Sequence, residues 1–143
     1  MAHLRTQIRT AVVSALTGLA TTGSRVHASR LRPTQALPCL LIETNDERIE
    51  QTIQAVQQRT LNVTVRAYAK VTATVDDTLD QIALETETAL AAAGSLGGKL
   101  PGGLLLERIE TDFDDTLEQP AGALVMQFTG SFFTASGSPG VLV

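Results

Sequence analysis

The chain has no tryptophan, one tyrosine and four phenylalanines, so aromatic residues make up only 3% of its 143 residues. Five scattered rings cannot form a platform on which bases stack, which argues against a reader of single-stranded nucleic acid. A net charge of −4 likewise argues against a general phosphate-binding surface. No secretory signal is visible, because Arg5 and Arg9 fall where its apolar core would lie. We therefore expect a soluble protein that is made in the cytoplasm and does not enter a membrane.

Cysteine and histidine are also scarce. The single cysteine, Cys39, excludes an internal disulfide, and its place in the apolar run LPCLLI predicts a buried, inert thiol. The two histidines, His3 and His27, lie far apart and have no CxxC or HxxxH companion, which makes a metal site unlikely by spacing.

Two other segments resemble ligand sites without matching them. Residues 94–103 are rich in glycine, but Lys99 is followed by leucine where a P-loop needs serine or threonine. The acidic run that starts at Asp112 lacks the glycine and the final acid of an EF-hand loop. We therefore expect no catalytic residue, no metal and no cofactor, and we expect the protein not to be an enzyme.

Length and composition predict one globular domain. A chain of 143 residues with 43% apolar and 18% charged residues can bury a core of its own. We assign residues 1–133 to this domain. Residues 134–143, TASGSPGVLV, are expected to be a flexible C-terminal tail.

Hydrophobic periodicity predicts the elements and their order. We expect a helix over 4–19, a short strand within 25–36, a buried strand over 37–44 ending in a turn at Asn45-Asp46, an alternating strand over 49–71, a helix capped by Asp76 and ended by Gly94, and strands over 104–113 and 122–133. The order α-β-β-β-α-β-β is typical of an α+β fold. It predicts a mostly antiparallel sheet with both helices packed on one face.

The alternating segment 49–71 is too long to be one straight strand. At about 3.3 Å per residue it would span roughly 75 Å, so it must turn, bend or project. Its robust part begins near Arg59, and the part before it is a looser strand or arm that is rich in glutamine. Candidates for contacts with neighbouring molecules are Gln51, Gln54, Gln57 and Gln58 in this arm, and Val141, Leu142 and Val143 in the tail.

Charge is divided unevenly along the chain. Residues 1–70 carry nine Lys or Arg and four Asp or Glu, whereas residues 71–143 carry two and eleven. Two faces of opposite sign would suit head-to-tail association, while solvated charges that interleave in the fold are the alternative. The candidate interface residues are Arg25, Arg30 and Arg32 on one copy and Asp112, Asp114, Asp115 and Glu118 on the next.

The layout of the whole chain resembles the tail terminator (minor tail protein U-like) family of long-tailed bacteriophages. The resemblance covers about residues 3–133 and rests on the order of parts: the helix LRTQIRTAVVSAL, the segment RVHASRLRP, the strand LPCLLIET, the strand QQRTLNVTVRAYAK, the helix DDTLDQIALETETAL and two strands joined by an acidic turn.

The resemblance implies a structural virion protein without catalytic residues. Such a protein forms a homo-hexameric ring at the head-proximal end of the tail tube, stops tube polymerisation and docks the head connector. Its partners would be the tail tube protein and a head-completion or connector protein, with genome DNA passing through the lumen without specific binding. It would be assembled in the host cytoplasm. Another neck component, a head-completion or tail-completion protein, is the nearest alternative, and a small bacterial α+β ligand-binding domain is a more distant one.

Overall fold

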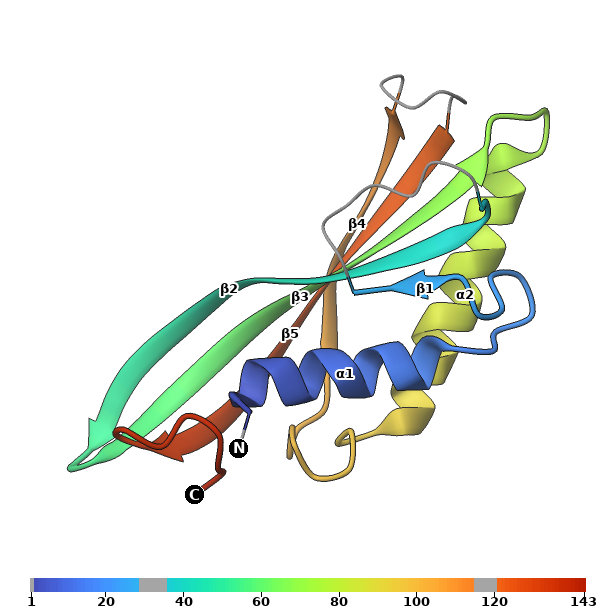
Figure 1. Ribbon diagram of the computed structural model, residues 1–143. Helices are drawn as coiled ribbons and strands as arrows, with labels where there is room; N and C mark the ends of the chain where they lie inside the picture. Colours follow the sequence, from blue (N-terminus) through green and yellow to red (C-terminus); the bar gives the residue numbers. More distant parts are fainter. Residues whose placement is uncertain (1, 29–35, 115–120) are drawn as a thin grey trace.

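A single five-stranded sheet organises the protein. The computed structural model describes residues 2–28, 36–114 and 121–143. In chain order the elements are α1 (Leu4–Leu16), β1 (Val26–His27), β2 (Cys39–Ile53), β3 (Val56–Lys70), α2 (Val75–Ala93), β4 (Leu105–Asp114) and β5 (Ala121–Ala135). The strand order is β1-β2-β3-β5-β4 (Figure 1). Only β1 and β2 pair in parallel, so the predicted α+β class and mostly antiparallel sheet are confirmed.

Both helices cover the same face of the sheet. Each contributes one apolar stripe at helical spacing, as in Leu4, Ile8 and Val12 of α1. These side chains pack in one core cluster with the inward residues of β2, β3 and β5, such as Val63 and Met126. The predicted packing of two helices on one face is therefore confirmed. Neither described helix is long and apolar enough to cross a membrane.

The helix ends differ slightly from the prediction. α1 ends at Leu16 rather than near residue 19, because Thr17 is already extended and Gly18 has a φ of 94°. The N-cap of α2 is Thr74, so the predicted cap at Asp76 is wrong. Asp76 instead lies in the first turn, where a carboxylate is stabilised by the helix dipole. Gly94 ends the helix as predicted, with a φ of 56°.

The turn predicted at Asn45-Asp46 is also wrong. β2 continues through this point with an irregularity in its pairing between Thr44 and Asp46, and the chain reverses only at residues 54–55. The Asn45 side chain is not used in a turn, because its Nδ2 donates to Thr64 Oγ1 across the hairpin at 2.8 Å. Pairing along a long hairpin has overridden the local turn signal.

A small second cluster lies on the opposite face of the sheet, which carries no helix. It contains Cys39, Leu41 and Tyr68 together with two alanines of β5. Burial raises the pKa of the Cys39 thiol to about 11, although Arg25 acts in the opposite direction. The predicted buried thiol is confirmed.

Candidate assembly surfaces

The sheet ends in two different strands, the two-residue β1 beside β2 on one side and β4 on the other. β1 pairs with β2 only at Leu40 and Leu41. Among the described residues, therefore, no strand lies against the outer side of β2 from Ile42 to Ile53, nor against the outer side of β4. Each edge offers backbone N–H and C=O groups with which a strand of another chain can pair.

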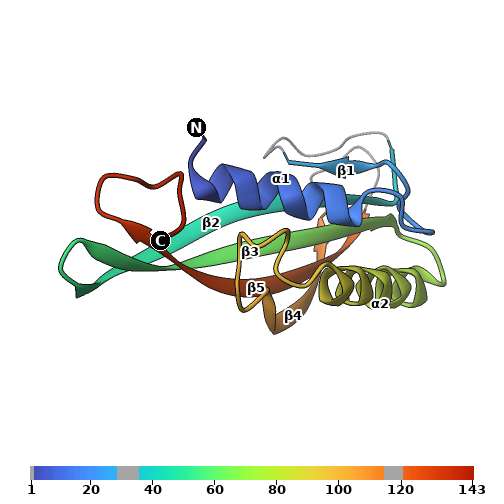
Figure 2. The ribbon, with the colours of Figure 1, turned by 90° about the horizontal axis from the view of Figure 1, so that it is seen from below.

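One end of the sheet projects past both helices. We call this part the arm and define it as residues 46–53 of β2, 56–62 of β3 and 129–135 of β5. Figures 1 and 2 show the tip of the β2–β3 hairpin extending beyond α1 and α2. The segment that was too long to be one straight strand thus both turns, at residues 54–55, and projects.

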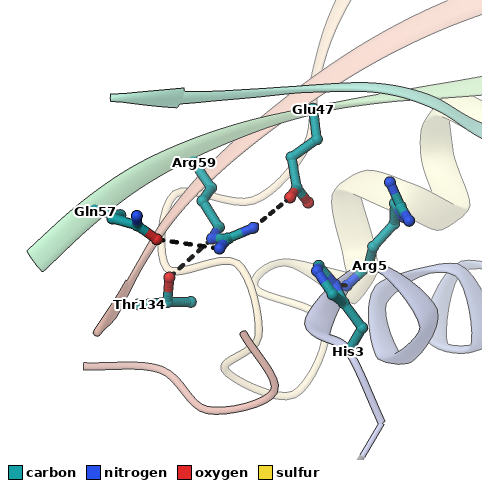
Figure 3. A network of polar contacts seen from close by, with 6 residues as sticks. All are labelled: His3, Arg5, Glu47, Gln57, Arg59 and Thr134. Atoms are coloured by element: carbon teal, nitrogen blue, oxygen red, sulfur yellow. Dashed lines mark hydrogen bonds and ion pairs between the residues drawn. The ribbon is translucent and has the colours of Figure 1, made fainter. Parts of the chain in front are cut away.

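A buried ion pair lies at the centre of the arm (Figure 3). Arg59 is only 7% exposed. Its Nη1 donates to Glu47 Oε2 at 2.6 Å, its Nε to Thr134 Oγ1 at 2.8 Å, and its Nη2 to Gln57 Oε1 at 3.1 Å. The second carboxylate oxygen of Glu47 is buried without a hydrogen-bond partner among the described residues. Burying these two charges costs desolvation free energy, and removing either residue would leave the other charge buried without a partner, which would destabilise the protein strongly.

Sequence analysis missed this ion pair, although a signal for it exists. In the alternating segment the odd-numbered residues are mostly apolar and face inward, as Leu61 and Val63 do. Arg59 occupies one of these inward positions. A charged residue in register with a buried apolar series needs a buried partner, and Glu47 provides it.

The two ends of the chain lie against the base of the arm (Figure 1). The backbone N–H of Leu4 donates to Pro139 O at 2.9 Å, and that of Val143 donates to Phe133 O at 3.0 Å. Leu142 packs against the core and forms an antiparallel bridge to β5. The last residues therefore lie beside β5 in the arm, beyond the point where its pairing with β4 ends.

Charged side chains gather on the sheet face that carries no helix, which we call the open face. Strand register places on it six described acidic residues and four described cations, three arginines and Lys70. These are Glu43, Asp46, Glu50, Glu107, Glu110 and Asp112, and Arg48, Arg66, Arg108 and Lys70. Several of them pair with one another, as Arg66 does with Glu43 at 3.1 Å. The open face keeps an excess of negative charge over these residues.

The predicted basic interface residues are only partly described. The Arg25 guanidinium is directed inward, with Nε donating to Pro38 O at 2.7 Å and Nη2 donating to Thr21 O at 3.1 Å. Arg30 and Arg32 lie outside the described residues. A role for these arginines between copies stays a prediction.

The predicted acidic partners are located in or after β4. Asp112 is exposed on the open face and already takes part in a polar interaction within the chain. Asp114 is the last residue of β4, and its side chain lies outside the described part, as do Asp115 and Glu118. The structure therefore does not bring the predicted basic and acidic groups together within one chain over the residues it describes.

Of the glutamine candidates, Gln51, Gln57 and Gln58 lie in the arm, and Gln54 lies in the turn at its tip. Gln51 and Gln54 are exposed, whereas Gln57 and Gln58 are half-buried. Gln57 accepts a hydrogen bond from Arg59, so part of its polar capacity is used within the chain. Contacts of these residues with another molecule stay a prediction.

The tail candidates differ in exposure. Val141 and Val143 are exposed, and Leu142 is half-buried. The first two residues of the expected tail, Thr134 and Ala135, belong to β5. The flexibility expected of residues 134–143, and the domain limit at 133, stay predictions.

A wide groove of about 640 Å³ lies between α1 and the loop after α2. It is lined mainly by small side chains of α1, including Thr6, Ala11 and Ser14, with Lys99 on the loop side. Its lining residues include no histidine and no carboxylate. Within the described residues, no three His, Cys, Asp or Glu side chains are placed to hold a metal ion.

Comparisons with known proteins give partial similarity to solved structures. No protein-family model and no curated protein sequence matches the chain. One solved structure, a chain in the virion of a native gene transfer agent particle, aligns with a TM-score of 0.41 and 15% identity. The alignment covers 90% of this chain and 92% of that one. Similarity at this level does not establish a shared fold, so the function must be argued from this chain's own residues.

Proposed function

We propose that this chain is a structural virion protein that forms a hexameric ring on the head-proximal end of a tail tube, stops tube polymerisation and offers the docking surface for the head connector. The order of its parts, which resembles tail terminators, suggests this role. The observation that carries it is the sheet with two open edges formed by unlike strands, β2 and β4.

Two unlike edges favour a ring over a two-fold dimer. When the edge of one copy joins a different edge of the next, the contact is heterologous, and it closes into a ring if the rotation between copies is an integer fraction of a full turn without a rise along the axis. Every copy then uses both of its edges, and no edge is left to aggregate. A ring of this kind is the form needed to cap a tube and leave a passage open.

The arm suits contact with the tail tube, and the open face suits the passage of DNA. The arm projects beyond the helices and can reach an adjoining ring of tube subunits (Figure 2). The open face carries six described acids against three arginines and Lys70. An acidic lining would repel phosphates, so DNA could slide through without being held.

The test is assembly on tubes. Purified protein is examined by mass photometry, and is then added to growing, uncapped tail tubes of the same particle, which are measured by electron microscopy. We expect a species of six copies, alone or on tube ends, and tubes that stop growing. Tubes that grow unchanged and carry no added ring would contradict the proposal. A ring that binds purified head connectors but not tubes would favour another neck component.

A further inference from the structure

The two open edges carry the same tetrapeptide. Glu-Arg-Ile-Glu occurs at residues 47–50, in β2, and again at residues 107–110, in β4. These strands lie at opposite edges of the sheet, separated by β3 and β5 (Figure 1). In both copies of the motif the arginine pairs with the second glutamate of its own strand, Arg48 with Glu50 and Arg108 with Glu110.

The two motifs also face the same way. Ile49 lies opposite Arg59, which lies opposite Phe132, and Ile109 lies opposite Met126. Phe132 and Met126 belong to the buried core, so both isoleucines are on the helix-bearing face. They are nevertheless 47% and 42% exposed. The arginines and second glutamates alternate with them and lie on the open face.

We propose that β2 of one copy pairs with β4 of the next copy in an antiparallel register that places Arg48 opposite Glu110, Ile49 opposite Ile109 and Glu50 opposite Arg108. This inference rests on the ring proposed above and specifies its interface. The motif Arg-Ile-Glu is complementary to itself when it is read in opposite directions. Opposite charges then face each other on either side of an apolar pair, which stabilises a strand pair.

The strand directions allow this register. β2 is antiparallel to β3, β3 to β5, and β5 to β4, so β2 and β4 run in opposite directions. Copies placed side by side with their helix-bearing faces on the same side therefore meet in antiparallel fashion. Backbone groups of both edges become paired, as in the addition of a strand to a sheet.

The register extends well beyond the motif. It brings the ten residues of β4 alongside β2 from Thr44 to Ile53, within the part of β2 that lies beyond its pairing with β1. At the far end Ile53 meets Leu105, both on the open face. They are the most exposed large apolar side chains of the strands, at 68% and 66%. One contact thus covers four exposed aliphatic side chains.

The stagger between the two motifs suits a closed sheet. Ile49 and Ile109 are level with Phe132 and Met126, six residues apart along β5, which is about 20 Å. Each copy contributes β2, β3, β5 and β4, a width of about 19 Å at about 4.8 Å per strand. If each motif joins the other motif of the next copy, the strands are therefore tilted by about 45° from the axis of the ring. This value is at the upper end of the strand tilts found in closed barrels.

A two-fold contact of β2 with β2, or of β4 with β4, would also match the motif to itself. Each of these contacts uses one edge twice and leaves the other edge open. The contact of β2 with β4 satisfies both edges of every copy, and the free part of β2 is long enough to take all ten residues of β4. The two-fold contacts are therefore treated as alternatives for the experiment to exclude.

Charge exchange tests the register without changing composition. The variant Arg48→Glu/Glu50→Arg keeps the ion pair within β2 but places Glu opposite Glu110 and Arg opposite Arg108. Arg108→Glu/Glu110→Arg does the same from β4, and the four substitutions together restore both opposite-charge pairs. By mass photometry we expect each exchange to weaken ring formation by at least tenfold and the combined variant to recover it.

The exchanges also separate the alternatives. A two-fold contact of β2 with β2 would be unaffected by either exchange, because each exchanged strand remains complementary to itself. Rings that persist in both single exchanges, or a combined variant that fails to recover, would overturn the register. Rings in the wild type together with these outcomes would leave the proposed function intact, whereas a wild type that neither forms rings nor caps tubes would contradict that function itself.

Cross-linking gives the register directly. Ile49→Cys/Ile109→Cys, in a Cys39→Ala background, should form covalent chains of up to six copies on mild oxidation, because the two cysteines of one chain are too far apart to join. Ile49→Cys/Thr111→Cys moves one cysteine along the same face by two residues and should cross-link at least fivefold less. Equal cross-linking of the two variants, or dimers from Ile49→Cys alone, would overturn the proposal.

Discussion

The helix-covered part of the sheet and the arm differ in the residues that occupy their inward positions. Under the helices, the residues between the layers are apolar side chains such as Ile8, Val63 and Met126, which form one continuous cluster. In the arm, the equivalent inward position is held by Arg59 and its partner Glu47. The first region is stabilised mainly by apolar burial. The second adds a buried ion pair to a few buried apolar residues, such as Leu61 and Phe132, and leaves its outer strand uncovered.

This difference separates folding from assembly. A region that must be stable in one copy can bury all its apolar residues. The arm, which the proposed ring would place against another copy, keeps aliphatic side chains such as Ile49 and Ile53 exposed and needs another source of order. The ion pair can supply that order, because its geometry is fixed by three hydrogen bonds to three different residues.

The largest expected effect comes from breaking the ion pair. Arg59→Met leaves the Glu47 carboxylate buried without its partner and should lower the free energy of unfolding by about 3–5 kcal/mol. Urea denaturation measures it. Arg48→Met, which removes an exposed ion pair on the neighbouring strand, is the matched control and should cost no more than about 0.5 kcal/mol. Similar losses of unfolding free energy in both variants would mean that the buried ion pair contributes no more to stability than the exposed one.

Apolar truncation should affect the two regions very differently. Ile8→Ala empties a fully buried site under α1 and should cost about 2–5 kcal/mol. Ile53→Ala, at the exposed tip of the arm, should change the stability of the single copy by less than about 0.5 kcal/mol. Urea denaturation of dilute protein compares them. A large loss for Ile53→Ala in a monomer would show that the arm is part of the folding core.

A polar clamp at the edge of the helical region should make stability depend on pH. Thr21 donates to both oxygens of Glu85, from its N–H at 2.9 Å and from its hydroxyl at 2.6 Å. Partial burial alone would raise the pKa of Glu85, but the hydrogen bonds from Thr21 and Gln81 outweigh it and the pKa is lowered. A lowered pKa in the folded state adds stability above the ordinary value, and this is lost as the pH falls through the folded pKa.

The variant Glu85→Gln isolates this contribution. Between about pH 5 and about pH 3, the wild type should lose roughly 1 kcal/mol more stability than the variant, a modest amount because the carboxylate is partly exposed. Thermal unfolding over this pH range measures the difference. Parallel pH profiles for the two proteins would contradict the assigned role of Glu85.

The smallest expected effect sharpens the proposed contact between copies. In the register drawn above, Asp46 of one copy lies near Asp112 of the next, so two like charges meet. Asp46→Asn removes one charge and keeps an oxygen that can accept the hydrogen bond of Asn62, now at 3.0 Å. We expect rings to become more stable by a few tenths of a kcal/mol per contact, seen as persistence at lower concentration. Rings that become less stable would argue against the placement of Asp46 near Asp112 of the next copy.

The elements and their order could be predicted because periodicity survives in the sequence. The apolar residues of both helices and of β5 recur at the spacing that one buried face requires. The turn at Asn45-Asp46 could not be predicted correctly, because cross-strand pairing decided it and local signals did not. The cap of α2 lies at Thr74, two residues before the predicted one, a displacement that is ordinary at helix ends.

The candidate surfaces were less accessible to sequence reasoning. Which strands end the sheet depends on topology, and Arg59 and Glu47 meet only because β2 and β3 form one long hairpin. The uneven charge of the two halves of the chain suggested contacts between the halves. In the structure, however, Arg66 of the first half pairs with Glu43 of the same half. Spatial pairing of this kind is not encoded at any fixed spacing.

The stagger of the two edges has a further consequence for size. Six copies, each contributing four strands tilted by about 45°, would enclose a bore of about 50 Å between facing backbones. The helices occupy the bulkier face and would lie outside, so the open face with its excess of acids would form the wall. Such a bore would pass a DNA duplex with a layer of water around it. The diameter of the channel would then be set by where two identical tetrapeptides fall along their strands.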